Sequence, residues 1–194
     1  MNSGIKENGW TAPFLSLDNI VKINVTAFYS GAGAKCKQYE SAFQTIGDKY
    51  HIDPVILASI AMQESSCNAD VSGGLMQVYC GNYDNGRCTN DIIPNVDAGA
   101  KYLRTQLDAS KNNIIKAFGL YNGWFTATES YGKNGGRGLT EDYPCHGGVG
   151  NGGPQNLDYL QQMLNGWLLG RDPQGVDSFI GSYHCQNCKN GALC

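Results

Sequence analysis

Residues 53–78 read DPVILASIAMQESSCNADVSGGLMQV, and this stretch decides the fold of the chain. Asp53 is a suitable N-cap and Pro54 suits the first helical position, so we expect a helix to begin here. The residues that follow are apolar on nearly every side of that helix, which predicts a place in the middle of a domain. The apolar run stops at Gln63 and Glu64. Glu64 is therefore a carboxylate at the end of a buried helix.

This position favours an acid that stays neutral near neutral pH. Apolar surroundings and the negative end of the helix dipole both disfavour the charged form, so the pKa of Glu64 should be raised. A neutral carboxylic acid can protonate the leaving oxygen of a glycosidic bond, as cleavage of that bond requires. The alternative is a solvated glutamate in a last helical turn, and helix position alone favours it.

The residues after Glu64 reverse that preference. Glu64-Ser65, a short turn and then Gly-Leu-Met-Gln at 74–77 resemble the signature of the goose-type lysozyme and soluble lytic transglycosylase superfamily. Two further blocks agree in order and approximate separation. Residues 95–103 (NVDAGAKYL) resemble the Asn, Gly, Tyr-Leu helix of that family, and residues 117–123 (AFGLYNG) resemble its Ala-Tyr-Asn segment. The resemblance implies a mainly α, lysozyme-like helical domain.

The resemblance also implies the roles of individual residues. Glu64 matches the general acid, and Tyr121 matches a tyrosine that lies close to that acid in the family. Ser72 stands near the position of a serine that bacterial transglycosylases use beside the substrate. The residues expected to line the sugar subsites are Ser72, Gln77, Tyr79, Tyr121 and Asn122.

Two reactions remain open at this stage. A hydrolase directs water to the anomeric carbon, usually with a second carboxylate. A lytic transglycosylase uses the acid alone, lets the sugar's own 6-hydroxyl attack, and leaves an anhydro product. Goose-type lysozymes place helper aspartates just before and just after Gly-Leu-Met-Gln, but Tyr79 occupies the later position here. Asp70, at a shorter spacing, is the best candidate for a base, with Asp84, Asp91 and Asp97 as weaker alternatives.

We therefore expect a muramidase that cleaves the β-1,4 bond between N-acetylmuramic acid and N-acetylglucosamine in bacterial peptidoglycan. A lytic transglycosylase reaction and chito-oligosaccharides as substrate are the alternatives within this class. A non-catalytic sugar-binding module and a disulfide-rich structural protein are alternatives from other classes. Intact Glu64, Gln77 and Tyr121 argue against a site that has lost its activity.

The amino-acid composition restricts the classes of partner that we expect for this chain. The 194 residues carry a net charge of −3, which argues against nucleic acid as a ligand. No apolar run approaches membrane-spanning length, so we expect no membrane segment. We also expect the protein to be a monomer. Residues 148–153 (GVGNGG) match a dinucleotide-binding pattern but lack the strand that should precede it. We expect no cofactor.

The eight cysteines, at 36, 67, 80, 88, 145, 185, 188 and 194, predict disulfides and an oxidising compartment. The beginning of the chain has no apolar signal segment, so we expect a secreted protein whose leader was removed. The spacing of Cys80 and Cys88 allows a local bridge. His184 with Cys185, Cys188 and Cys194 could hold zinc, but disulfides are the better interpretation in a cysteine-rich chain, so we expect no metal.

The expected organisation is an N-terminal extension (1–35), a catalytic domain (36–170) and a Cys-rich tail (171–194), with both ends packed on the domain. Apolar periodicity predicts an amphipathic helix over 38–50, a helix capped by Asn95, and a helix that starts at Asn113. A last amphipathic helix carries its apolar residues at Leu157, Leu160, Leu164, Trp167 and Leu168.

Overall fold

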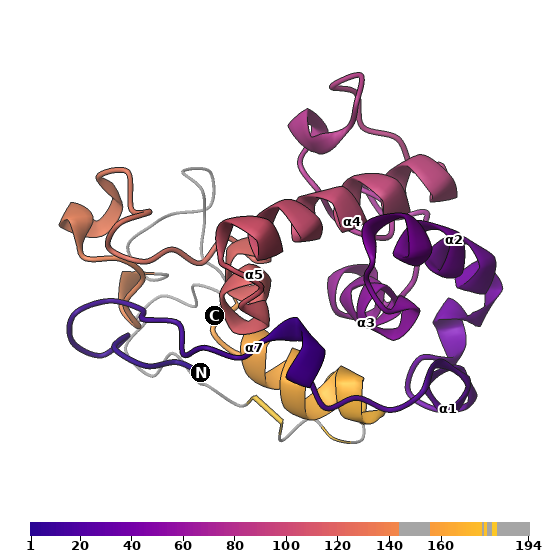
Figure 1. Cartoon of the computed structure of the whole chain (residues 1–194), viewed down its shortest axis with the longest axis horizontal. Coiled ribbons are helices and arrows are strands. Elements are labelled where there is room, and N and C mark those ends of the chain that lie inside the picture. The colour runs from indigo at the N-terminus through magenta and orange to yellow at the C-terminus, as the bar shows by residue number, and fades with distance from the viewer. Residues whose placement is uncertain (144–155, 176, 178–179, 182–194) are drawn as a thin grey trace.

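Helix α3 (Pro54–Ser65) lies in the middle of the molecule, as its apolar sequence predicts. In the computed structural model it is surrounded by α2 (Glu40–Tyr50), α4 (Ile92–Ala109) and the segment that begins with α7 (Tyr159–Gln161) (Figure 1). The Asp53 carboxylate accepts a hydrogen bond from the Val55 N–H at 3.0 Å, and Pro54 is the first helical residue. All residues from Val55 to Met62 are buried.

The structure describes residues 1–143, 156–175, 177 and 180–181, and this part of the chain is mainly helical. It contains no strand, and only an isolated bridge pairs Ser16 with Asn113. The predicted fold class is thus confirmed. None of its helices is both long and apolar enough to cross a membrane.

Helices α2 and α4 pack against α3, and α5 (Ile114–Tyr121) packs against α4 and α7. The apolar faces of all three helices lie in one core, as periodicity predicts. The buried positions are Ala42, Phe43 and Ile46 on α2 and Val96, Ala100, Leu103 and Leu107 on α4. Asn113 caps α5 by accepting a hydrogen bond from the Lys116 N–H.

The predicted cap at Asn95 is wrong. Helix α4 begins at Ile92, with Asp91 in the capping position. Pro94 is tolerated in the first turn because its missing N–H would have no helical partner there. Asn95 therefore lies inside the helix, and its side chain is fully buried.

The last predicted helix is present but irregular. Helix α7 continues into a π-helical turn (Gln162–Gly166) and a 3-10 turn (Trp167–Leu169). The wider π turn changes which side chains face inwards, so Met163 is buried and Leu164 is only partly buried. Glycine is needed at residue 166, the last residue of the π turn, because a Cβ there would lie 2.9 Å from the Pro173 ring.

Two disulfides brace the described part of the chain. The predicted local bridge joins Cys80 to Cys88, and a second bridge joins Cys36, on the 3-10 segment Ala34–Tyr39, to Cys67. Cys67 lies just beyond the end of α3, so this bridge ties that end to the neighbouring segment. The other four cysteines and the zinc alternative lie outside the described residues.

The N-terminal residues also contribute to the core. Ile5 and Trp10 are buried, and Trp10 packs edge-on against Trp124 with ring centroids 5.0 Å apart. The next part of this segment includes a 3-10 turn (Leu17–Asn19) and helix α1 (Val25–Ser30).

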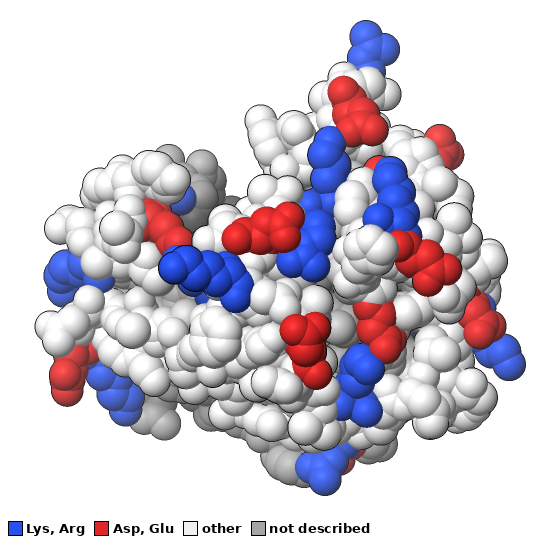
Figure 2. All heavy atoms as spheres, viewed as in Figure 1, with Lys and Arg blue, Asp and Glu red and all other residues white. Residues whose placement is uncertain are grey.

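On the face shown in Figure 2, acidic and basic side chains alternate without a large patch of one sign.

Candidate active site

The carboxyl group of Glu64 lies in the last turn of α3 and is half-buried. The Tyr159 hydroxyl donates a hydrogen bond to Glu64 Oε1 at 2.8 Å. Burial raises the pKa of Glu64 to about 7, although the hydrogen bond from Tyr159 opposes the rise. The direction of this shift is the one that the sequence predicts. Near pH 7, Glu64 is therefore a neutral acid in a large fraction of the molecules. Part of the residue is still exposed and open to a ligand.

Two tyrosines lie close enough to Glu64 to sense its charge. Burial, and after it the negative charge of Glu64, raises the pKa of both Tyr121 and Tyr159 well above the ordinary value. The Tyr121 hydroxyl donates to the Met76 carbonyl at 2.9 Å, which ties α5 to the Gly-Leu-Met-Gln loop. The structure thus brings Glu64 and Tyr121 together. Sequence reasoning missed Tyr159, since no motif marks it within a segment whose apolar pattern indicates core packing.

The loop at residues 73–77 is held by the buried side chain of Asn95. Asn95 Oδ1 accepts a hydrogen bond from the Met76 N–H at 2.8 Å, and Nδ2 donates to the Gly73 carbonyl at 3.0 Å. The same amide donates to the Tyr83 hydroxyl at 2.7 Å. Gly74 has φ +68°, and a Cβ at this position would lie 2.3 Å from Asn95 Nδ2, so only glycine fits. Asn95 therefore shapes the loop next to Tyr121.

The other predicted substrate contacts lie around this loop. Gln77 is exposed, with φ +50°, and its amide nitrogen donates to the carbonyls of Ser72 at 2.7 Å and Gly74 at 2.8 Å. Only its carbonyl oxygen is left for a ligand. The Ser72 side chain is exposed, and Tyr79 is 80% exposed. Asn122 ends α5, and its amide donates to the Asn156 carbonyl at 3.2 Å.

Asp70 lies on the surface of the turn between Glu64 and the loop. Its backbone N–H bonds to Asn68 Oδ1, and its carboxylate has no hydrogen bond or ion pair within the described residues. Asp70 does not contribute to the pKa shift of Glu64.

The alternative aspartates have structural roles. Asp84 forms an ion pair with Lys101 at 2.6 Å. Asp97 pairs with Lys49 and accepts a hydrogen bond from the Tyr50 hydroxyl. Asp91 stands at the cap of α4. Within the described residues, no group of three or more His, Cys, Asp or Glu side chains could hold a metal ion.

A chain of side-chain amides joins the helix ends around Glu64. Gln63 Oε1 accepts from the Trp167 indole N–H at 2.7 Å, and Gln63 Nε2 donates to Gln162 Oε1 at 2.8 Å. The Asn156 side-chain amide donates to the same Gln162 oxygen at 2.9 Å, and the Asn156 backbone carbonyl accepts from the Asn122 amide at 3.2 Å. The two contacts of Gln63 join residues 99 and 104 positions apart, so no local sequence pattern predicts them. Together, the amide contacts fix the end of α3 against the ends of α5 and α7.

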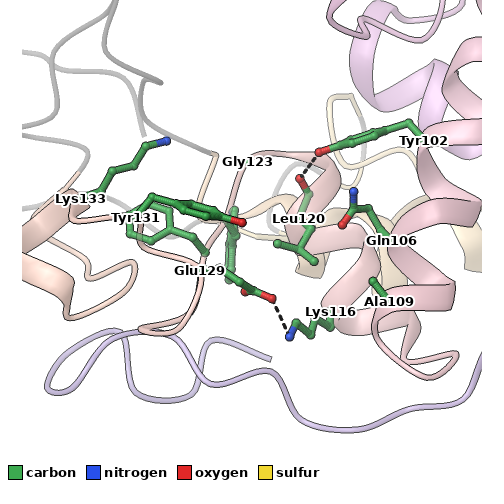
Figure 3. Close-up of a pocket in the computed structure, with 11 residues that line it drawn as sticks. Tyr102, Gln106, Ala109, Lys116, Leu120, Gly123, Glu129, Tyr131 and Lys133 are labelled. Carbon is green, nitrogen blue, oxygen red and sulfur yellow. Dashed lines mark hydrogen bonds and ion pairs between the residues drawn. The ribbon is translucent and has the colours of Figure 1, made fainter. Parts of the chain in front are cut away.

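A pocket of about 410 Å³ opens beside this cluster (Figure 3). Its walls are α4, the end of α5, and the segment from Gly123 to Lys133. Tyr102 lines the pocket and packs against Tyr121 with ring centroids 5.4 Å apart. Tyr121, whose pKa is raised by burial and by the charge of Glu64, therefore lies between the pocket wall and the acid.

A helical domain that carries a half-buried, protonatable glutamate at the end of its central helix is the arrangement of the lysozyme-like enzymes. Residues 41–143, more than half of the chain, match the family model described as the transglycosylase SLT domain. The chain belongs to this family. It is therefore an enzyme of the glycosidase or lytic transglycosylase type, with peptidoglycan as its class of substrate.

Proposed function

We propose that the protein is a lytic transglycosylase that cleaves the β-1,4 bond after N-acetylmuramic acid and leaves a 1,6-anhydro sugar. One observation carries this proposal. Burial raises the pKa of Glu64 to about 7, and no second carboxylate contributes to that shift. All 17 acidic residues of the chain belong to the described part, so this comparison covers every Asp and Glu side chain. The proposed reaction therefore relies on Glu64 alone.

One carboxyl group is sufficient for this reaction. Neutral Glu64 donates its proton to the glycosidic oxygen as the bond from that oxygen to the anomeric carbon breaks. The 6-hydroxyl oxygen of the same sugar then bonds to the anomeric carbon, and its proton passes to the Glu64 carboxylate. The acid is regenerated without water. The Tyr159 hydroxyl, which donates to Glu64 Oε1, orients the carboxyl group through both steps.

Hydrolysis by a muramidase is the second candidate reaction. The exposed carboxylate of Asp70 is the feature that favours it. This carboxylate lies in the turn after Glu64 and has no partner among the described residues. A ligand that draws this turn towards the anomeric carbon would give the water its base. The product would then end in a reducing muramic acid.

We also propose that the enzyme works outside the cell. The Cys36–Cys67 and Cys80–Cys88 bridges support this, since disulfides persist in oxidising compartments. Peptidoglycan, the substrate class of the family, also lies outside the cell membrane.

Digestion of purified peptidoglycan tests the proposed reaction. Soluble fragments lighter by one water than the reducing form are expected, and reducing ends alone would show a muramidase instead. The Glu64→Gln variant should fold and lose activity by roughly 10²-fold or more, because an amide has no acidic proton to donate. Near-normal activity of this variant would overturn the assignment of the acid.

A further inference from the structure

Two polar side chains of the pocket beside Tyr102, Gln106 and Tyr131, have no hydrogen-bond partner among the described residues. Gln106, half-buried on α4, makes no side-chain hydrogen bond within the described residues. Tyr131 is 91% exposed and stands on the opposite wall. Figure 3 shows the Tyr131 hydroxyl and the Gln106 amide directed towards the space between the two walls. These groups are placed to bind a polar ligand.

The pocket also has an excess of positive charge. Lys116 and Glu129 form an ion pair at 2.7 Å on one side of it, and these two charges cancel. Thr126 donates from its hydroxyl to Glu129 Oε2 at 2.7 Å, which holds the carboxylate in this arrangement. Lys133 lines the same pocket and has no ion pair among the described residues, and the remaining residues contain no Asp or Glu. One cation is therefore left over.

Lys133 is held at the rim of the pocket. Its ammonium group lies 5.6 Å from the centre of the Phe125 ring, and its backbone N–H donates to the Ser130 carbonyl at 2.8 Å. A cation over an aromatic ring keeps much of its hydration and can still pair with an anion. An exposed lysine in this position favours a carboxylate over an uncharged group.

The two kinds of glycan that fit this enzyme class differ in this chemistry. Chitin carries only neutral N-acetylated sugars. Muramic acid carries a lactyl arm that ends in a carboxylate or continues into a peptide with its own amides and carboxylates. We infer that the Tyr131–Lys133 pocket binds the carboxylate-bearing lactyl arm of a muramyl residue, and that Lys133 makes the enzyme prefer peptidoglycan to chitin. This inference rests on the proposed function, since it assumes that the glycan passes Tyr102 on its way to Glu64.

Binding to the full-length Glu64→Gln protein tests the inference without turnover. Three tetrasaccharide probes are compared by calorimetry: chitotetraose, a peptide-free muramyl glycan, and the same glycan with its peptides. Lys133→Met should weaken binding of the muramyl probes about three- to fivefold and leave chitotetraose unchanged. The loss should shrink as salt is added. Lys37→Met, which removes an exposed lysine outside the pocket, is the matched control and should change none of the three.

The probes also identify the source of the carboxylate. The lactyl carboxyl group is a free carboxylate in the peptide-free probe and a neutral amide in the peptide-bearing probe. A loss only with the peptide-free probe assigns the contact to the lactyl carboxylate, and a loss with both probes shows that Lys133 also pairs with a carboxylate of the peptide that extends the arm. A loss only with the peptide-bearing probe assigns the contact to the peptide and overturns the lactyl contact. Gln106→Ala reports on the opposite wall and should weaken the same probes. An equal loss with chitotetraose would overturn the inference, because the pocket would then hold a neutral sugar ring, and so would no loss with any probe. Absence of cleavage in the digest would refute the proposed function but would leave these affinities measurable.

Discussion

The surroundings of Glu64 support its proposed catalytic role and also lower the stability of the folded protein at high pH. Its pKa is about 7 in the folded protein against an ordinary value of 4.5. Proton donation needs the neutral form, so we expect kcat/KM to fall as pH rises through about 7. Initial rates of muropeptide release between pH 5 and 9 would check this. Activity that keeps rising above pH 8 would contradict Glu64 as the acid.

The same shift predicts how stability depends on pH. Unfolding lets Glu64 ionise freely above pH 4.5, whereas the folded protein resists ionisation up to about pH 7. Folding is therefore favoured most below pH 4.5, and this contribution is lost as pH rises from 4.5 to 7. Glu64→Gln removes the ionisation but can still accept the Tyr159 hydrogen bond. At pH 8 it should raise the free energy of unfolding by about 1–3 kcal/mol.

Urea unfolding of both proteins at pH 4 and pH 8 measures this difference. The two proteins should be equally stable at pH 4, where Glu64 is protonated in either state. An equal gain at both pH values would show that the amide packs better for reasons unrelated to charge.

Asp70 distinguishes the two reactions at the level of one residue. If Glu64 acts alone, Asp70→Asn should leave kcat within about twofold of the unchanged protein and leave the products as anhydro sugars. The substitution keeps the side chain's size and removes only its charge. A large loss of rate together with reducing-end products in the unchanged protein would favour a water-activating base.

Glu64 could be predicted from sequence because its signal is local: an apolar helix, a carboxylate at its end and a glycine-rich motif soon after. Tyr159 could not, since it lies 95 residues from Glu64 and begins a segment whose leucines indicate only core packing. The hydrogen bond from Gln63 to Gln162, 99 residues apart, could not be predicted for the same reason. Side-chain amides form such networks only after the helices have packed.

At the scale of elements, the helices that follow a regular period were predictable, and the departures have local causes. An asparagine before an apolar stripe usually caps a helix, but Ile92, Ile93 and Pro94 already extend α4 by one turn before Asn95. The π turn after α7 likewise breaks the period on which the assignment of Leu164 to the core depended. In both places the local rule yields to the packing of neighbouring segments.

The burial of Asn95 makes α4 the support of the Gly-Leu-Met-Gln loop. Asn95→Ala removes hydrogen bonds to the Met76 N–H, the Gly73 carbonyl and the Tyr83 hydroxyl. The Met76 N–H stays buried without this partner, whereas the Tyr83 hydroxyl keeps its hydrogen bond to the Thr89 carbonyl. The variant should therefore lose about 2–4 kcal/mol of unfolding free energy. Asn90→Ala is the matched control. Asn90 holds the Val71 carbonyl with one exposed hydrogen bond, so its loss should cost less than about 1 kcal/mol.

Urea unfolding with a kinetic assay would separate stability from function in these two variants. Asn95→Ala should also lower kcat/KM at temperatures where the protein is still folded, because the loop that meets Tyr121 loses its support. Equal stability of the two variants would show that Asn95 does not hold the loop.

At the scale of the whole molecule, the family match at 41–143 does not contain all of the core. Segments from both sides of it close the structure. The Glu141 N–H donates to the Ile5 carbonyl at 2.8 Å, and the Ile23 N–H donates to the Leu168 carbonyl at 2.8 Å. Tyr159, the hydrogen-bond partner of Glu64, also lies beyond the matched residues. The site therefore depends on parts of the chain that the family pattern does not describe.

Trp10, in the segment before the matched residues, is buried against the core and allows a test of this dependence. It is 1% exposed, its backbone N–H donates to the Leu139 carbonyl at 2.8 Å, and its ring packs on Trp124 in the wall of the pocket. A Cβ at residue 119 would lie 2.2 Å from the Trp10 ring, so the ring fits only over the bare backbone of Gly119. Trp10→Ala should lower the unfolding free energy by about 3–5 kcal/mol. It should also weaken glycan binding, because Trp124 loses its support.

Phe14→Ala is the control for Trp10, since Phe14 is an aromatic residue of the same segment that is 69% exposed. Its removal should change stability by no more than about 0.5 kcal/mol. Urea unfolding followed by circular dichroism, with calorimetric binding of the peptide-bearing glycan at a temperature where each variant is folded, measures both effects. If Trp10→Ala behaved like Phe14→Ala, the N-terminal segment would be an appendage, and residues 41–143 with the α7 segment would hold the site without it.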